Sequence, residues 1–378
     1  MPLSQVQPQK YEALLAEKVT TVSALLTPYD APAPRIFRSE PTGFRLRAEF
    51  RVWHDGDALD YVMFRRDDPK TPVPIQDFPI ADTHIQALMP VLVERVKAHT
   101  ELRRKLFQVE FLATLSGDML VTLVYHRKLE QDWEALATQL RDDLQADFPG
   151  LSIIGRSRRQ KVILGRDHVT EVLPIEGRDY RYQQFEQAFT QPNGRVNIQM
   201  IEWACEQARD CPGDMLELYC GNGNFTLPLS RHFENVIATE LSKTSVKAAR
   251  QNLVDNSIDN IQLVRLSAEE VTQAMNGERE FRRLRELPQP LADYDLRTVF
   301  VDPPRAGLDE HTVGMVAGFD TVLYVSCNPE TLAANLESLC RTHRIASFAL
   351  FDQFPYTHHM ECGVRLVRRE DTVGQASG

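Results

Sequence analysis

The sequence predicts an α/β protein of two domains, an α+β domain at residues 1–178 and a domain with a parallel sheet at residues 179–378. The chain has 378 residues, of which 43% are hydrophobic, and this is enough material for two cores. The first half contains apolar runs paired across short turns, as in hairpins. From about Tyr180, apolar runs alternate with helical patterns, which is typical of a parallel sheet.

The first half is predicted to consist of hairpins and helices. Apolar residues at helical spacing predict a helix from Tyr11 to Leu26, and strict alternation predicts a strand from Phe44 to Trp53. Asp55-Gly56 favours a hairpin turn before a returning strand at residues 59–64. Further along we expect a helix at 82–98 with a kink or break at Pro90, a hairpin of 107–115 and 119–126, a helix at 133–148, and short strands at 151–154 and 161–164.

Positive charge is concentrated in the first half, although the whole chain carries a formal net charge of −10. Segments rich in Lys and Arg lie at residues 35–51, 103–105 and 155–166, and the last of them contains no acidic residue. Because phosphate binding depends on such charges, the segments favour a nucleic-acid-binding face, with ordinary solvated surface as the alternative. Arg51 and Phe107 are candidates for phosphate contact and base stacking, and packing in the core is the alternative for Phe107.

The second half is predicted to hold a nucleotide-like ligand at the carboxyl edge of its sheet. An apolar strand around residues 215–219 runs into the turn Gly221-Asn222-Gly223-Asn224-Phe225, where glycines let the backbone approach a ligand. The next strand, at 236–239, ends at Glu240, where nucleotide-binding folds place an acid for ribose hydroxyls. Phe225 leaves little room for a pyrophosphate, so S-adenosylmethionine, which has ribose and adenine but no phosphate, fits better. Further strands are expected at 261–266, 298–301, 322–326 and 348–351, and Asp302 is held at the same edge by the two prolines that follow it.

Cys327 is the candidate nucleophile. It follows an apolar, β-branched run and precedes Asn328-Pro329, which forces the chain to turn, so we expect its thiol at the sheet edge where ligands bind. The alternative is that Cys327 is a small buried hydrophobe, the usual role of a free cysteine. All six cysteines lie in the second half and no two are spaced as CxxC, so neither disulfides nor a common zinc site is expected.

Glu361 is the candidate proton acceptor. It lies in a segment dense in His and Glu, but His358 and His359 are adjacent rather than spaced as metal ligands, so no metal is expected there. No apolar run is long enough to span a membrane, and the first residues lack the apolar segment of a signal peptide. We therefore expect a cytoplasmic protein.

Four segments together resemble the RNA 5-methyluridine methyltransferases, and most closely the bacterial tRNA (uracil-5-)-methyltransferases. They are Glu217–Phe225, Asp302–Arg305, Ser326–Pro329 and Asp352–Gly363, and the likeness extends to residues 47–56 and 189–193. The resemblance implies a Rossmann-like S-adenosylmethionine-dependent methyltransferase domain preceded by an RNA-binding domain, with Cys327 as nucleophile and Glu361 as base. It also implies S-adenosylmethionine contacts from Gln191, Tyr219, Asn224, Glu240 and Asp302. Candidate substrate contacts are Arg51, Phe107, Arg305 and Gln353.

The resemblance also implies a substrate. Relatives that act on ribosomal RNA typically carry a cysteine-ligated iron-sulfur cluster in the N-terminal half, and here that half has no cysteine. We therefore expect no iron-sulfur cluster, and we expect the substrate to be the T-loop uridine of tRNA, which becomes ribothymidine. We also expect a monomer. The tRNA-like part of transfer-messenger RNA (tmRNA) is a plausible second substrate. No membrane partner is expected.

Uracil chemistry explains why this reaction needs a thiol and a base. C5 of uracil is a poor nucleophile, but addition of the Cys327 thiolate to C6 would place electron density at C5, and Glu361 would later remove the C5 proton. Arg305 would either favour the thiolate or hold the uracil carbonyl. Three alternatives stay open: a methyltransferase for 23S ribosomal RNA, an RNA-binding or folding factor with little turnover, and an adenine amino-group methyltransferase, which would have an aromatic residue where Arg305 stands.

Overall fold

The computed structural model describes residues 6–370 except residues 57 and 66. These residues form two compact units that interleave along the sequence. The first unit contains 6–11, 40–173 and 181–195, and the second contains 12–39, 174–180 and 196–370. A single domain boundary between residues 178 and 179 stays a prediction, and the compact units differ from it chiefly because residues 12–39 group with the second unit.

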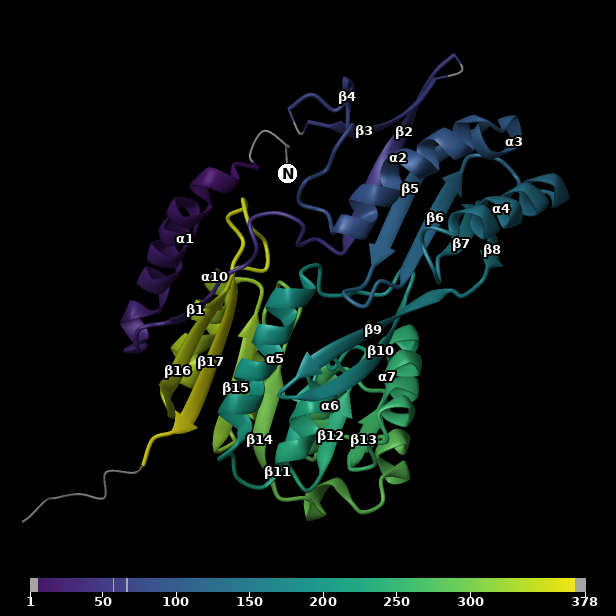
Figure 1. Cartoon of the computed structure of the whole chain (residues 1–378). Coiled ribbons are helices and arrows are strands. Elements are labelled where there is room, and N and C mark those ends of the chain that lie inside the picture. The colour runs from purple at the N-terminus through teal and green to yellow at the C-terminus, as the bar shows by residue number, and fades with distance from the viewer. Residues whose placement is uncertain (1–5, 57, 66, 371–378) are drawn as a thin grey trace, which may run out of the picture. The chain divides into compact units, whose positions relative to one another are not determined.

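The first unit is built on a mostly antiparallel sheet (Figure 1). Its strands, in spatial order, are β4 (Pro72–Pro74), β3 (Ala58–Phe64), β2 (Arg47–Asp55), β5 (Leu106–Ala113), β6 (Met119–Tyr125), β7 (Ser152–Ser157) and β8 (Gln160–Leu164). β6 and β7 are parallel, and helix α4 (Gln131–Leu144) connects them and contacts β7 and β8. Helix α2 (Thr83–Lys97) contacts β3 and β5 and continues through Pro90, and the short helix α3 (Thr100–Arg103) follows it.

Strand β2 alternates between core and solvent as its sequence predicts. Phe50 is buried in an aromatic cluster, with ring centroids 5.0 Å from Phe78 and 5.4 Å from Tyr61, whereas Arg51 is exposed. Because side chains along a strand point to alternate faces, burial of one face fixes the direction of the other. The core thus holds Arg51 on the outer face of the strand.

A two-stranded ribbon, β9 (His168–Ile175) and β10 (Arg178–Phe185), carries residues of both units. The ribbon was not predicted from the sequence. Three of the eight residues of β10 are exposed, so the strand lacks the apolar run from which strands were predicted.

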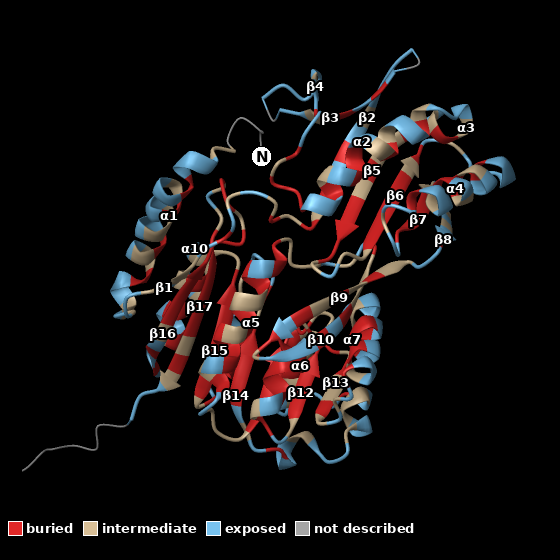
Figure 2. Ribbon diagram, viewed as in Figure 1, coloured by how far each residue is buried: buried red, intermediate tan, exposed pale blue. Residues whose placement is uncertain are grey.

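The second unit is built on an eight-stranded sheet in the described chain. Its strands, in spatial order, are β1 (Arg35–Phe37), β16 (His343–Phe351), β17 (Glu361–Arg368), β15 (Thr321–Ser326), β14 (Leu296–Val301), β11 (Asp214–Leu218), β12 (Val236–Thr239) and β13 (Ile261–Val264). All pairs are parallel except those of β17, which runs antiparallel to β15 and β16. β11, β12 and β15 are buried along their whole length (Figure 2), so the core of this unit lies at the middle of its sheet.

Helices connect and cover these strands. Those of the second unit are α5 (Gly194–Ala208), α6 (Thr226–Leu229), α7 (Lys243–Asp255), α8 (Ala268–Met275), α9 (Glu310–Val316) and α10 (Pro329–Leu339), together with nearly all of α1 (Tyr11–Leu26). Short 3₁₀ helices are η2 (Pro8–Lys10), η3 (Thr27–Tyr29), η4 (Ser230–His232), η5 (Arg282–Glu286) and η6 (Leu291–Asp293). No helix in the described residues is both long enough and apolar enough to cross a membrane.

Candidate active site

The structure brings Cys327 and Glu361 to one edge of the second unit's sheet. Cys327 directly follows β15, as its sequence predicts. Glu361 is the first residue of β17, and the antiparallel register places its neighbour Cys362 opposite Ser326. The carboxyl end of one strand and the amino end of the other therefore meet, and a thiol and a carboxyl group lie at the same place.

The electrostatic environment of the thiol opposes its ionisation. Burial, together with the nearby Glu361 and Asp302 carboxylates, raises the pKa of Cys327 to about 11, whereas Arg305 acts in the opposite direction. Burial raises the pKa of Asp302 to about 7, and burial and Asp302 together hold the pKa of Glu361 well above its usual range. The effect of Arg305 thus has the expected sign, but the acids and burial outweigh it.

The turn after Cys327 is held by hydrogen bonds to the loop after β14. Asn328 caps α10 by accepting from the N–H of Glu330 at 3.2 Å, and Pro329 begins the helix. The Asn328 side-chain amide also donates to the carbonyl of Arg305 at 3.1 Å. This bond joins the backbone at Arg305 to the turn that carries Cys327. The guanidinium group of Arg305 lies 3.4 Å from Nδ1 of His359.

The glycine turn after β11 is tied to Glu240. The N–H of Gly221 donates to the Glu240 carboxylate at 3.0 Å, and the N–H of Ser242 donates to it at 2.7 Å. Gly223 has φ of 90°, and a Cβ there would lie 2.3 Å from Cδ1 of Leu227, so this position requires glycine. A Cβ at Gly221 would meet no atom within 4 Å, so the backbone there borders open space.

The sequence also predicted cofactor contacts from Asn224, Tyr219 and Gln191. The side-chain amides of Asn224 and Asn197 of α5 bond to each other reciprocally at 2.8 and 2.9 Å. Tyr219 directly follows β11 with a left-handed φ of 60°, uncommon for a residue with a side chain. Gln191 belongs to the first unit, so its predicted contact stays a prediction.

The hydrogen-bonding groups at this edge of the sheet and the open space beside Gly221 fit S-adenosylmethionine. A carboxylate at the end of β12, Glu240, suits ribose hydroxyls, and the open side of Gly221 allows close approach of a ligand. The carboxyl group of Asp302 follows β14 at the same edge.

Lys18 of α1 is a residue that the sequence analysis missed. Its Nζ lies 2.5 Å from Oδ1 of Asp352 and donates to the carbonyl of Phe354 at 3.1 Å. The two paired side chains are only 10% and 2% exposed. Helix α1 therefore anchors the loop between β16 and β17, which leads to Glu361. No local pattern could reveal this pair, because its members are 334 positions apart.

Gln353, in the same loop, points toward the core of the second unit. It is buried, and its Nε2 lies 3.7 Å from Sδ of Met200 of α5. The predicted substrate contact of Gln353 therefore stays a prediction.

Arg51 and Phe107 lie together on the first unit, in a stack that also contains His126. The guanidinium carbon of Arg51 lies 3.5 Å from the centroid of the Phe107 ring, and the ring of His126 is stacked on Phe107 at 3.8 Å. Phe107 is half-buried rather than part of the core. His126 was not predicted to belong to this stack. The predicted hairpin could have indicated it, because pairing the two strands places the end of the second strand, at His126, opposite Phe107.

Several cations of the three basic segments have acidic partners. Arg156 and Lys161 pair with Glu186, at 2.5 and 3.2 Å, and Arg166 pairs with Asp118 at 2.6 Å. In the other segments, the pairs are Arg35 with Glu206, Arg38 with Glu12, and Arg104 with Glu101. A high density of Lys and Arg in the sequence therefore overstates the charge that is free to meet a ligand.

One group in the described residues has the spacing of a metal site, and it does not include Cys327. Ligand atoms of Glu176, Cys205 and His232 fall within 4.8 Å of one another. Glu176 is paired with Arg209 at 2.6 Å and lies 3.8 Å from Arg231. These guanidinium groups oppose a further cation, so we assign no metal to the group.

Strand order and site together define the class. A parallel sheet with one reversed strand between β15 and β16, a glycine turn after β11, and an acid after β12 make the second unit a Rossmann-like S-adenosylmethionine-dependent methyltransferase fold. The fold class predicted from the sequence is confirmed.

Comparison with known proteins identifies the family. The model of the family tRNA (Uracil-5-)-methyltransferase matches residues 10–369, and the chain belongs to this family. The tRNA/tmRNA (uracil-C(5))-methyltransferase of Dickeya chrysanthemi (strain Ech1591) is 52% identical over 361 residues, covering 96% of this chain and 98% of the relative. That of Vibrio parahaemolyticus is 51% identical over 369 residues, covering 98% and 100%. The predicted resemblance is thus confirmed.

A solved structure shares the fold of nearly the whole chain. The tRNA (uracil-54, C5)-methyltransferase of Pyrococcus abyssi, in complex with S-adenosyl-L-homocysteine, matches with a TM-score of 0.70 and 22% sequence identity. The match covers 94% of this chain and 83% of the other.

Proposed function

We propose that this protein methylates C5 of the T-loop uridine of tRNA, using S-adenosylmethionine, with Cys327 as nucleophile and Glu361 as base. Membership of the tRNA (uracil-5-)-methyltransferase family supports the reaction and the substrate. The observation that carries the mechanism is the meeting of Cys327 and Glu361 at one edge of the sheet. We further propose that the protein acts in the cytoplasm as a monomer. We also propose that it accepts tmRNA as a second substrate, because its relatives are named tRNA/tmRNA methyltransferases.

The residues of this chain divide the reaction into steps. In its deprotonated form, the sulfur of Cys327 forms a bond to C6, and the electron pair of the C5–C6 double bond moves toward the C4 carbonyl, so C5 becomes nucleophilic. When bound, S-adenosylmethionine would supply the methyl group for C5 from its positively charged sulfur and would leave as S-adenosylhomocysteine. Glu361 then accepts the C5 proton, the C5–C6 double bond reforms, and the C6–sulfur bond breaks to release Cys327.

The cofactor would lie between the glycine turn and the ends of β12 and β14. Glu240 would accept hydrogen bonds from ribose, and Tyr219, Asn224 and Asp302 would border the ligand, as the family resemblance implies. The family resemblance also implies a contact from Gln191. Arg51 and Phe107, stacked with His126, would contact the RNA, since aromatic and guanidinium faces stack on unpaired bases.

Two substitutions test the covalent mechanism. Cys327→Ala should lower methylation by about 10³-fold or more while tRNA binding persists, because only the bond to C6 is lost. With a transcript containing 5-fluorouridine, wild-type protein should form an adduct that survives a denaturing gel, and Cys327→Ala should form none.

Glu361→Gln gives a complementary result. It should accumulate a covalent protein–RNA complex with ordinary uridine, because addition proceeds but the C5 proton stays. Methylation at the wild-type rate in Cys327→Ala, with no adduct in any variant, would refute the mechanism.

The alternative of an RNA-binding or folding factor with little turnover is tested by the same protein. A single-turnover assay with labelled S-adenosylmethionine should transfer label to tRNA. An absence of label in RNA, alongside tight binding, would favour the alternative.

A further inference from the structure

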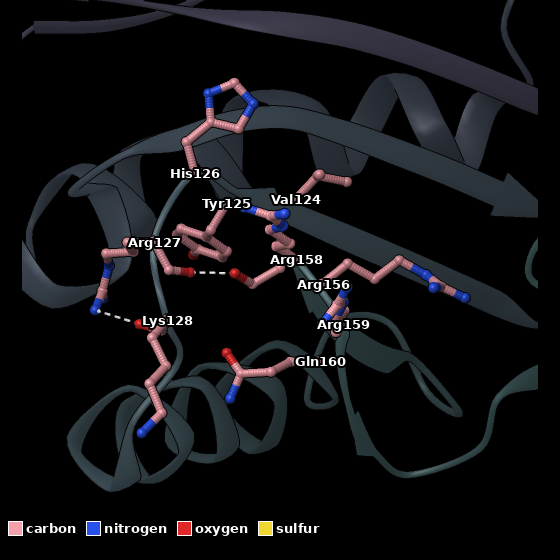
Figure 3. A pocket seen from close by; sticks show the side chains of 10 residues that line it. Val124, Tyr125, His126, Arg127, Lys128, Arg156, Arg158, Arg159 and Gln160 are labelled. Atoms are coloured by element: carbon pink, nitrogen blue, oxygen red, sulfur yellow. Dashed lines mark hydrogen bonds between the residues drawn. The ribbon is translucent and has the colours of Figure 1, made fainter.

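A basic hollow lies on the first unit, separate from the residues assigned to the reaction. It has a volume of about 810 Å³ and is lined by the end of β6 with the residues after it and by the β7–β8 hairpin (Figure 3). The cationic side chains that line it are Arg127, Lys128, Arg156, Arg158 and Arg159. Its lining therefore contains positive charge from two segments of the chain.

Only part of this charge is neutralised within the protein. Arg156 donates two hydrogen bonds to the Glu186 carboxylate, at 2.5 and 2.7 Å, and Arg127 pairs with Glu101 at 3.0 Å. Lys128, Arg158 and Arg159 are exposed, and within the described residues their side chains have no ion pair or hydrogen bond. Three of the cations that line the hollow thus have no ion pair in the part of the chain that the structure describes.

The turn of the β7–β8 hairpin contains two of these cations and holds one of them, Arg159, in an unfavourable backbone conformation. Ser157 pairs with Gln160, so the turn consists of Arg158 and Arg159 alone, and Arg159 has a left-handed φ of 62°. Two-residue hairpin turns favour asparagine and glycine, which adopt this conformation at little cost. Arginine at a position that would suit glycine is a reason to look for a function of its charge.

The hollow adjoins the stack formed by Arg51, Phe107 and His126. His126 contributes to both features, because its ring stacks on Phe107 and also lines the hollow. A surface that combines stacked rings with unpaired cations suits RNA, since the rings meet bases and the cations meet phosphates.

We propose that this basic hollow binds the phosphate backbone of folded RNA, with Lys128, Arg158 and Arg159 as the contacting cations. This inference rests on the proposed function, because it gives the RNA substrate a second contact surface, one that recognises no base. The phosphates come either from the stem-loop that contains the target uridine or from the rest of the tRNA.

The test measures binding of two RNAs by the full-length protein at several salt concentrations. The variant Arg158→Gln/Arg159→Asn removes both turn charges, and asparagine tolerates the left-handed φ of Arg159. We expect about tenfold weaker binding at low salt, and a slope of log K against log salt that is smaller by about 1.8, since each lost phosphate contact contributes about 0.9. The probes are an unmodified tRNA transcript and its isolated T-arm stem-loop.

The two probes distinguish the source of the phosphates. Weaker binding of both RNAs places the contact in the stem-loop, and weaker binding of the whole transcript alone places it in the remaining tRNA. Arg341→Gln/Arg344→Gln is the matched control, because it removes two exposed charges at the amino end of β16, the sheet edge opposite Cys327.

Unchanged affinity and an unchanged salt slope for both RNAs would overturn the inference, as would an equal loss in the control variant. Thermal unfolding of each variant checks that it is folded. Methylation of the stem-loop by wild-type protein tests the proposed function separately, so failure of the reaction and failure of the hollow give different results.

Discussion

At the scale of single residues, Cys327 combines two demands that conflict. The thiolate is the reactive form, yet burial, Glu361 and Asp302 raise the pKa of the thiol to about 11. The proposed chemistry needs a carboxylate next to the reacting carbon, so a base close enough to accept the C5 proton is also close enough to disfavour the thiolate. Arg305 partly offsets this effect.

Alkylation of Cys327 by iodoacetamide should therefore depend steeply on pH. A pKa of about 11 lies above the working range, so the thiolate fraction and the rate should rise about tenfold per pH unit from pH 7 to 10. Arg305→Gln removes an opposing cation and should shift the curve to higher pH, while Arg305→Lys should shift it less. Mass spectrometry of the Cys327 peptide measures the rate.

A substitution that should shift the alkylation curve in the opposite direction serves as a control for that prediction. Asp302→Asn removes a carboxylate that raises the pKa of Cys327, so its curve should move to lower pH. Identical curves for wild type, Arg305→Gln and Asp302→Asn would show that these charges do not govern the thiol.

The positions of some of these residues in the fold could be predicted from the sequence, and those of others could not, for identifiable reasons. The position of Cys327 followed from local rules, because an apolar run and a proline fix the end of β15. The meeting with Glu361 followed only from family resemblance, since it requires the insertion of β17 beside β15. Lys18 and the neutralising role of Glu186 depend on long-range packing, which no spacing in the sequence encodes.

At the scale of elements, helix α1 and the loop between β16 and β17 act together through one buried ion pair. Burial lowers the pKa of Lys18, and the Asp352 carboxylate opposes that shift. A buried charge without a partner is far less stable than a buried pair or a neutral pair. The loop's position therefore depends on both members.

Lys18→Met should destabilise the protein by about 3–5 kcal/mol, because it leaves the Asp352 carboxylate buried without its cation. Lys18→Met/Asp352→Asn should recover much of this loss, since neither buried charge remains. Urea unfolding of the second unit measures both free energies. Equal unfolding free energies for the single variant and wild type would show that the pair does not hold the loop.

Elements with a strong apolar pattern matched their predictions, and elements without one did not. The helix at Tyr11–Leu26 and the strand at Val236–Thr239 have the predicted bounds. α2 continues through Pro90, so the expected break is absent and the packing of its buried face outweighs the cost of proline, whereas the expected kink stays a prediction. β17 was not predicted, because a strand that reverses direction within a parallel sheet leaves no signal in a reading of alternating strands and helices.

At the scale of the whole molecule, the second unit requires residues from the start of the chain. Leu15, Val22 and Leu26 of α1 are buried, and β1 pairs with β16 at the edge of the sheet. The ring of Phe37 stacks on that of Phe351 at 4.7 Å. The compact units are therefore not two consecutive segments of sequence.

A fragment of residues 179–378, the predicted contiguous domain, should be much less stable than the second unit in the full chain. It loses the buried side chains of α1, each worth about 2 kcal/mol, and exposes the edge of β16. Urea unfolding and binding of a hydrophobic dye measure the difference. Co-expression with residues 6–39 should restore cooperative unfolding; equal stability of the fragment alone would contradict the prediction.

Overall charge and local charge give different expectations for RNA binding. The net charge of −10 argues against affinity for phosphate, and the abundance of Lys and Arg in the first half argues for it. In the 155–166 segment, ion pairs neutralise Arg156, Lys161 and Arg166, whereas Arg158 and Arg159 have no ion pair among the described residues. Partners, rather than composition, determine which cations can meet RNA.

The position of β17 has a consequence for biosynthesis. β17 lies between β15 and β16 but leaves the ribosome after both, so the middle of this sheet stays open while its flanking strands already exist. β1, made earliest, must also wait for β16 before it can pair. A nascent chain that stops before Glu361 would carry the proposed nucleophile without the proposed base, so under the proposed mechanism translation must pass that codon before the protein can modify RNA.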